Sequence, residues 1–178
     1  MLSALRQLFS PSAVKQQAYE AYVQVVAQAR LPVFYKEWQV EDTLDGRFDL
    51  IVLHVFLMLA RCDDELERED VQDFSRFLSE AFFADMDRSL REMGASDTGV
   101  GIRVKNMAQA FYGRVKAYRD AIGDETALAD ALVRNVYRER PVSAGIVASL
   151  AAYIGRNRQA LQRQPIDGIM QGSITFSH

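Results

Sequence analysis

Apolar side chains recur at helical spacing along most of this 178-residue chain. No stretch alternates between apolar and polar residues beside a hairpin dipeptide, so we expect no sheet. The spacing predicts helices over residues 12–30, 46–61, 69–93, 100–122, 124–138 and 142–164, with a break in the third near residues 83–87. Residues 1–178 are therefore predicted to form one compact all-α domain of six or seven helices. Its core covers about residues 12–164, and residues 165–178 are expected to form a polar tail that is extended or partly mobile.

The second predicted helix, residues 46–61, is apolar around nearly its whole circumference, as is typical of a buried central helix. It contains His54, and the chain's second histidine is its last residue. We interpret His54 as a core histidine bound to one hydrogen-bond partner, with a proton shuttle or a ligand as the alternative.

The net charge of −3 argues against a general nucleic-acid binder, but the charge is unevenly distributed. Residues 1–98 carry a net charge of −8 and residues 99–178 carry +5. The C-terminal part is therefore suited to an anionic partner.

The sequence predicts neither a metal site nor a cofactor. Cys62 is the single cysteine, and the acidic residues that follow it disfavour a reactive thiol. The acidic run over residues 63–73 lacks the spacing of a calcium loop, which favours a solvated acidic surface.

No catalytic motif is present, so we expect no enzyme; an acid/base pair of Asp42 and His54 is the alternative. No secretory signal or bilayer-spanning segment is visible, which predicts a soluble, cytoplasmic protein.

Two stretches carry candidate binding residues. The first, residues 32–54, joins aromatic side chains to polar ones at a helix entrance. In the structural interpretation Asp42 or Thr43 caps the helix, Arg47 pairs with a carboxylate and the aromatic side chains fold inward. In the functional interpretation these residues form a partner surface.

The second stretch is the helix predicted over residues 100–122, where Asp97 or Thr98 is the expected cap. Its apolar stripe consists of Val104, Met107, Phe111, Val115, Tyr118 and Ile122. Arg103 and Arg114 border one side of this stripe, and Lys105, Lys116 and Arg119 border the other. Small, neutral residues fill the remaining arc, which suits either close packing of another helix or the floor of a groove. These residues are Asn106, Gln109, Ala110, Gly113 and Ala117. Such a groove with a basic rim would accept an anionic or amphipathic partner.

Together these stretches resemble the ubiquinol–cytochrome c chaperone family. The matching blocks are QARLPVFY at 28–35, VEDTLDGRFDLIVLH at 40–54, REMGASDTGVGIRVKNMAQAFYGRVKAY at 91–118 and ALVRNVY at 131–137. The blocks occur in order and with similar spacing, over about residues 15–165.

The resemblance implies an all-helical, non-enzymatic protein that assists the assembly of ubiquinol–cytochrome c reductase, respiratory complex III. Mitochondrial members help newly made cytochrome b at the translating ribosome, near the exit tunnel, and act with a small partner protein. Because no long transit peptide rich in arginine and serine is visible, we expect a bacterial member in the cytoplasm, close to the inner-membrane surface.

The resemblance also assigns candidate roles to individual residues. The candidates for a client or partner surface are Phe34, Tyr35, Asp42, Thr43, Gly46 and Arg47. The candidates for contacts to ribosomal RNA, anionic lipid or an acidic partner are Arg103, Lys105, Arg114 and Lys116. The alternative function is a peripheral module that binds anionic lipid at the inner membrane through the basic C-terminal half.

Overall fold

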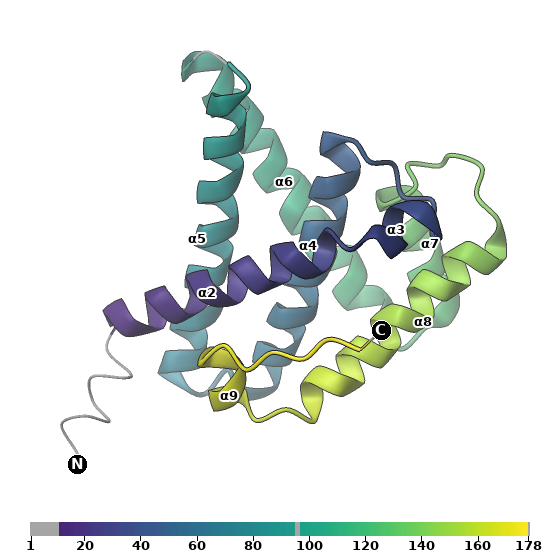
Figure 1. The fold of residues 1–178 in the computed structure, drawn as a ribbon. Helices are drawn as coiled ribbons and strands as arrows, with labels where there is room; N and C mark the ends of the chain where they lie inside the picture. The colour runs from purple at the N-terminus through teal and green to yellow at the C-terminus, as the bar shows by residue number, and fades with distance from the viewer. Residues whose placement is uncertain (1–10, 95–96, 178) are drawn as a thin grey trace.

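A computed structural model describes residues 11–94 and 97–177 (Figure 1). The helices are α2 (Pro11–Ala29), α3 (Pro32–Lys36), α4 (Leu44–Cys62), the 3-10 turn η1 (Asp63–Glu65), α5 (Glu69–Glu92), α6 (Asp97–Ala121), α7 (Glu125–Asn135), α8 (Ala144–Gln162) and α9 (Ile166–Met170). No strand occurs within the described ranges. The predicted all-α fold is confirmed, and the short helices α3 and α9 are additions to the predicted set.

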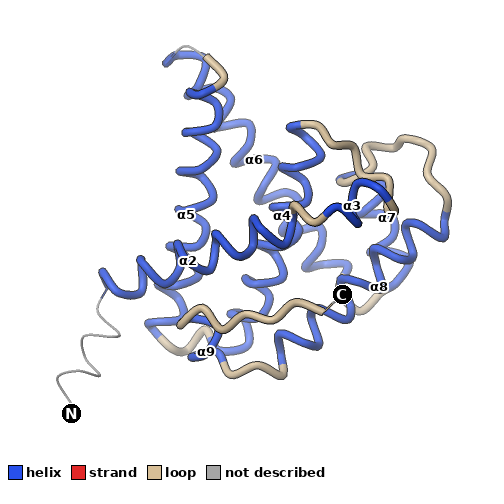
Figure 2. The backbone as a smooth tube through the Cα atoms, in the orientation of Figure 1, coloured by secondary structure: helices blue, strands red, loops and turns tan. Residues whose placement is uncertain are grey.

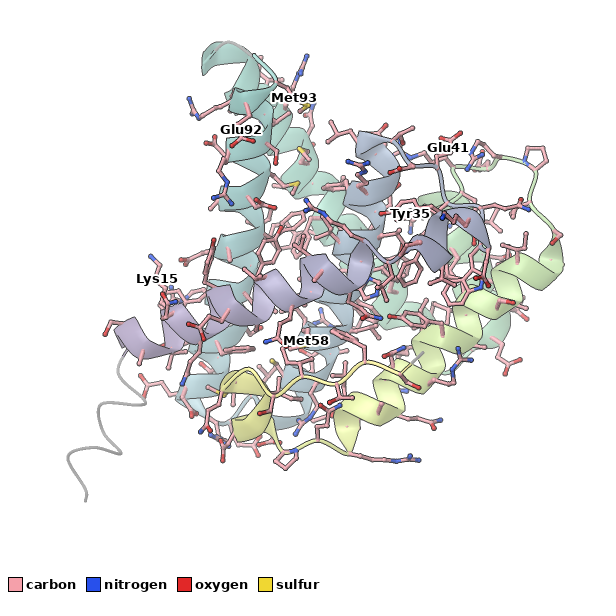
Figure 3. The ribbon with its side chains drawn as sticks, viewed as in Figure 1. Lys15, Tyr35, Glu41, Met58, Glu92 and Met93 are labelled. Carbon is pink, nitrogen blue, oxygen red and sulfur yellow. The ribbon has the colours of Figure 1, made fainter. Side chains whose placement is uncertain are left out.

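Helix α4 is the centre of the fold. Every residue from Phe48 to Leu59 is buried, and α2, α5, α6 and α8 all pack against this helix. Figure 3 shows Met58 in the middle of the molecule, among the surrounding helices. The uniformly apolar circumference read from the sequence thus corresponds to a helix with neighbours on all sides.

The start of α4 is defined by a tight approach of the chain to itself. The Thr43 hydroxyl accepts a hydrogen bond from the Gly46 amide at 3.1 Å, which caps the helix. A Cβ atom on Gly46 would lie 2.0 Å from the carbonyl oxygen of Glu41. Only glycine therefore fits at this position without movement of the backbone.

Helices α5 and α6 are long, and their adjoining ends project beyond the other helices in Figure 1. Glu92 and Met93 lie at this projecting end in Figure 3. The predicted break near residues 83–87 is wrong, because Phe82 stacks on Phe111 of α6 with ring centroids 4.7 Å apart and the helix continues through this contact. The expected cap by Asp97 or Thr98 depends on side chains outside the described part of the chain.

The C-terminal segment requires a correction. We expected a polar tail after residue 164, but Ile166, Ile169 and Met170 are buried in α9. The extended residues that follow run alongside α8 (Figure 2), where the amide of Ser177 donates to the Oδ1 of Asn157 at 2.8 Å. Three apolar side chains at helical spacing were enough to add this segment to the core.

His54 is a core histidine, as expected, but it has two partners rather than one. Its Nδ1 lies 2.7 Å from the carbonyl oxygen of Leu50, and its Nε2 lies 2.8 Å from the Tyr153 hydroxyl. Since a carbonyl can only accept, Nδ1 carries the proton and Nε2 accepts from the hydroxyl. Complete burial lowers the pKa of His54 from 6.5 to about 4, so the ring is neutral at physiological pH.

This shift predicts that His54 makes the folded state less stable in mild acid. The unfolded chain binds a proton at His54 below pH 6.5, whereas the folded protein does so only near pH 4, so acid favours unfolding. Between about pH 7.5 and about pH 5 the wild type should lose about 2 kcal/mol more unfolding free energy than a His54→Gln variant. Urea unfolding of both proteins at the two pH values measures this difference. Equal losses would contradict the assignment.

The start of α4 yields a second prediction. Gly46→Ala should reduce the unfolding free energy by about 1–3 kcal/mol, because the new methyl group meets backbone that cannot move aside. Gly113→Ala is the matched control, since the added Cβ has open space within the helix α6. The control should stabilise the protein by up to about 1 kcal/mol. Chemical denaturation of the two variants measures both effects, and a neutral Gly46→Ala would refute the described approach to Glu41.

Candidate functional site

A groove of about 310 Å³ opens between the start of α4, the end of α5 and the middle of α6. Its surface combines apolar side chains with three arginines. The lining residues are Leu44, Asp45, Phe48, Leu90, Arg103, Asn106, Met107, Ala110, Arg114 and Arg138. Asn106 and Ala110 belong to the arc of small, neutral residues on α6. We expected either a closely packed helix or the floor of a groove at this arc, and in the structure these two residues line a groove.

Beneath the groove, the fully buried carboxylate of Asp49 connects three separate parts of the chain. Its Oδ1 lies 2.9 Å from the Nε of Arg114 on α6, and Oδ2 lies 3.1 Å from the guanidinium of Arg138, after α7. Arg138 also reaches Asp45 at 2.8 Å. The Arg114 contact is an attraction between charges, because those two atoms are not aligned as a hydrogen bond.

Burial dominates the electrostatics of Asp49. It raises the pKa of this carboxyl to about 6, although the positive charges of Arg114 and Arg138 act in the opposite direction. The carboxylate is thus ionised at neutral pH only with the support of its two arginines. Removal of the carboxylate would leave two guanidinium groups without their shared partner.

The loop that carries Arg138 has an unusual backbone. Arg138 and Glu139 have φ angles of 53° and 59°, in the left-handed region that favours glycine. Each such residue costs on the order of 1 kcal/mol or more, so surrounding contacts must fix the conformation. The ion pairs of Arg138 with α4 do this on one side, and the Tyr137 hydroxyl, which donates to the Trp38 carbonyl at 3.0 Å, does so on the other.

The four basic candidates from the sequence do not form one patch. Arg103 and Arg114 line the groove, whereas helical geometry places Lys105 and Lys116 on the other flank of α6. Arg114 is largely buried and bound to Asp49, and Lys116 pairs with Asp120 on the surface. Arg103 is exposed, and no described carboxylate lies within ion-pair distance of it.

The candidates at residues 34–47 divide between core and surface. Phe34 is fully buried against Trp38, His54 and Tyr153, so its assignment to a partner surface is corrected. Tyr35 is half-buried, and its hydroxyl donates to the Ala29 carbonyl at 3.1 Å.

The polar members of the same group support the helix start. Thr43 is the cap, and Gly46 permits the close turn described above. Arg47 forms an exposed ion pair with Asp42 at 2.7 Å. The structural interpretation of this stretch is therefore confirmed. Partner contacts through Tyr35, Asp42 or Arg47 stay a prediction.

The alternative acid/base pair does not form. The two ring nitrogens of His54 bind Leu50 and Tyr153, one each, while Asp42 faces solvent and binds Arg47.

Cys62 is buried, which raises the pKa of its thiol to about 12, with a smaller contribution from its acidic neighbours. In the acidic run, Asp63 pairs with Arg119, and Glu65 pairs with Arg61. Over the described residues, no group of His, Cys, Asp and Glu side chains is arranged to bind a metal ion.

The sequence analysis did not identify the buried charge cluster of Asp49 and Arg138. Asp49 was visible only as an interruption of an apolar helix, although an acid in that setting requires a buried basic partner. Arg138 lies 89 residues further along the chain, in a loop without a recognisable pattern.

Within residues 11–94 and 97–177, no helix combines the length and the apolar character needed to cross a membrane.

Comparison with known proteins identifies the class. The sequence model of the ubiquinol-cytochrome C chaperone family matches residues 36–176, which include α4, the groove and α8. The crystal structure of a Cbp3 homolog from Brucella abortus has the same fold, with a TM-score of 0.82 and 35% sequence identity over 100% of this chain and 97% of that one. The chain belongs to the ubiquinol-cytochrome C chaperone family.

A more distant relative is ubiquinol-cytochrome-c reductase complex assembly factor 1 of Xenopus laevis. It is 24% identical to this chain over 149 residues, which are 83% of this chain and 74% of the Xenopus protein. The similarity therefore extends from a bacterial to a vertebrate protein.

The buried charge cluster yields a prediction for stability. Asp49→Ala should reduce the unfolding free energy by about 3–5 kcal/mol, because it leaves Arg114 and Arg138 without their shared buried partner. Asp42→Ala is the matched control, since it removes the same group from an exposed pair with Arg47, and the unfolding transition should hardly move. Denaturant titration compares the two. Similar small effects from both substitutions would show that the cluster is not important for the fold.

Proposed function

We propose that this protein is a non-enzymatic chaperone for the assembly of ubiquinol–cytochrome c reductase and that its client is newly made cytochrome b. The match of the family model to residues 36–176 carries this proposal. The name of the Xenopus relative, an assembly factor for the same reductase complex, supports it.

The surface of the molecule is compatible with this role. A membrane-protein segment that has not yet reached its final position exposes apolar side chains, which need temporary cover. The groove offers apolar walls from Phe48, Leu90 and Met107, next to charged groups. Surfaces of this mixed kind bind amphipathic or apolar helices while the chaperone itself stays in water.

We propose further that the protein acts in the cytoplasm beside the inner membrane and meets its client at the ribosome. Helix α6 carries a net charge of +3, and Lys105 and Lys116 lie on its flank away from the groove. Exposed basic side chains of this kind are suited to RNA phosphates or anionic lipid headgroups. The proposed contacts to a partner protein are Tyr35 in α3, Asp42 just before α4 and Arg47 in the first turn of α4.

Loss of the protein should prevent accumulation of the reductase. In cells that lack the gene, intact ubiquinol–cytochrome c reductase and the haem b absorbance of cytochrome b should fall at least several-fold, and the wild-type gene should restore both. Native electrophoresis and reduced-minus-oxidised spectra of membranes measure this result. A normal amount of active reductase without the gene would contradict the proposal.

The client and the stage of its synthesis are tested by site-specific photo-crosslinking. A crosslinker at position 35 or 105 is presented with ribosomes stalled during synthesis of cytochrome b, and with an unrelated multi-spanning protein as the control. Crosslinks to nascent cytochrome b or to ribosomal components, absent with the control protein, are the expected result. Crosslinks to neither would contradict action at the ribosome. Flotation with anionic vesicles, if it occurred without any association with cytochrome b, would instead favour the lipid-binding function.

A further inference from the structure

We infer that the groove between α4, α5 and α6 binds an apolar segment of the client that carries one acidic side chain, and that Arg103 binds its carboxylate. This inference rests on the proposed function and adds to it the binding surface and the chemistry that is recognised. The occupant is a polypeptide, and a lipid is the alternative that the experiment must separate from it.

Each charged side chain around the groove is paired with a side chain of opposite charge, with the exception of one arginine. The two carboxylates of the site, Asp45 and Asp49, are already bound by Arg138 and Arg114. Arg103 lines the same groove, is exposed, and has no ion-pair partner among the residues that the structure describes. The site therefore has one arginine in excess, and a planar guanidinium is suited to bidentate binding of a carboxylate.

The remaining surface of the groove requires an apolar occupant. Phe48, Leu90 and Met107 contribute its apolar walls, and Leu44 at its edge is 49% exposed. An exposed leucine beside an open apolar groove continues the surface available to a partner. The volume of about 310 Å³ is at the small end of the range for ligand pockets, which fits a few side chains from one segment rather than a whole domain.

The floor of the groove permits a close approach by a helix. Ala110 is the small side chain there, and Asn106 adds an exposed amide that can bind polar groups of the occupant. Small residues allow two helix backbones to pack closely, as they do between helices inside membranes. An apolar helix with one acidic residue thus satisfies the shape, the apolar walls and the unmatched charge together.

The charge of the neighbouring helix gives an anionic bilayer little advantage as the occupant. Only the end of α5, at Leu90, lines the groove, and residues 85–92 carry a net charge of −1. An anionic membrane surface would therefore gain little more than the single unmatched arginine, whereas a segment with one carboxylate needs only Arg103.

The test uses the full-length protein and cytochrome b released from the ribosome with puromycin. Arg103→Glu should weaken the association at least about tenfold, because a charge-assisted contact becomes a repulsion. Arg156→Glu is the matched control: it makes the same substitution at an exposed arginine of α8, outside the groove, and should have little effect. In the same way, Leu44→Asn should weaken the association, whereas Leu66→Asn, at a leucine of comparable exposure outside this groove, should not.

A crosslinker at position 106, with position 159 on α8 as the control, identifies the segment that is bound. The crosslinked peptide of cytochrome b should be apolar and contain an Asp or Glu. Replacement of that residue by Lys should restore binding to the Arg103→Glu variant. Such an exchange of charges would be difficult to obtain if Arg103 were only structural.

Three results would overturn the inference. Equal binding by the Arg103→Glu and Arg156→Glu variants, in a protein that still binds cytochrome b and is required for the reductase, would leave the proposed function intact and exclude the groove as the binding surface. Loss of anionic-vesicle binding in Arg103→Glu, with cytochrome b binding unchanged, would assign the groove to lipid. If the wild type bound no cytochrome b and its gene were dispensable for the reductase, the proposed function would fail and the inference with it.

Discussion

The buried carboxylate of Asp49 is the constraint on which the groove between α4, α5 and α6 depends. It lies on the central helix, where every neighbouring residue is buried, and it requires opposite charge from elsewhere in the chain. Arg114 on α6 and Arg138 after α7 supply that charge, so one polar group fixes the relative positions of three elements. The groove lies directly above this cluster. The ion pairs of Arg114 and Arg138 are therefore internal supports of the groove, and Arg103 is the arginine that stays available to a partner.

Most of the fold could be predicted from the sequence, because helical spacing reports burial directly. The apolar circumference of α4 indicated its central position, and the stripe on α6 that contains Phe111, Val115 and Tyr118 is buried as expected. The errors came from contacts between distant segments. The stacking of Phe82 on Phe111 continues α5 through the expected break, and Ile166, Ile169 and Met170 attach the C-terminal segment to the core. Neither contact is visible in a local pattern.

The candidate site was less predictable, for a physical reason. A charged residue in a sequence does not show whether its partner is internal or external, and the difference decides its role. Arg103 and Arg114 occupy similar positions on α6, yet Arg114 meets a buried acid and Arg103 does not. Similarly, Phe34 follows a proline in an apparently exposed connector, but it packs into the core against His54 and Tyr153. The family resemblance pointed to these regions of the chain without separating residues for folding from the residues proposed for binding.

The central claim, that a client segment occupies the groove above Asp49, is tested most directly by hydrogen exchange. Amide exchange of the full-length protein is measured by mass spectrometry alone and in complex with purified cytochrome b. We predict additional protection at the start of α4, the end of α5 and residues 103–114 of α6. Protection confined to α2 and α8, with the helices of the groove unchanged, would contradict the account.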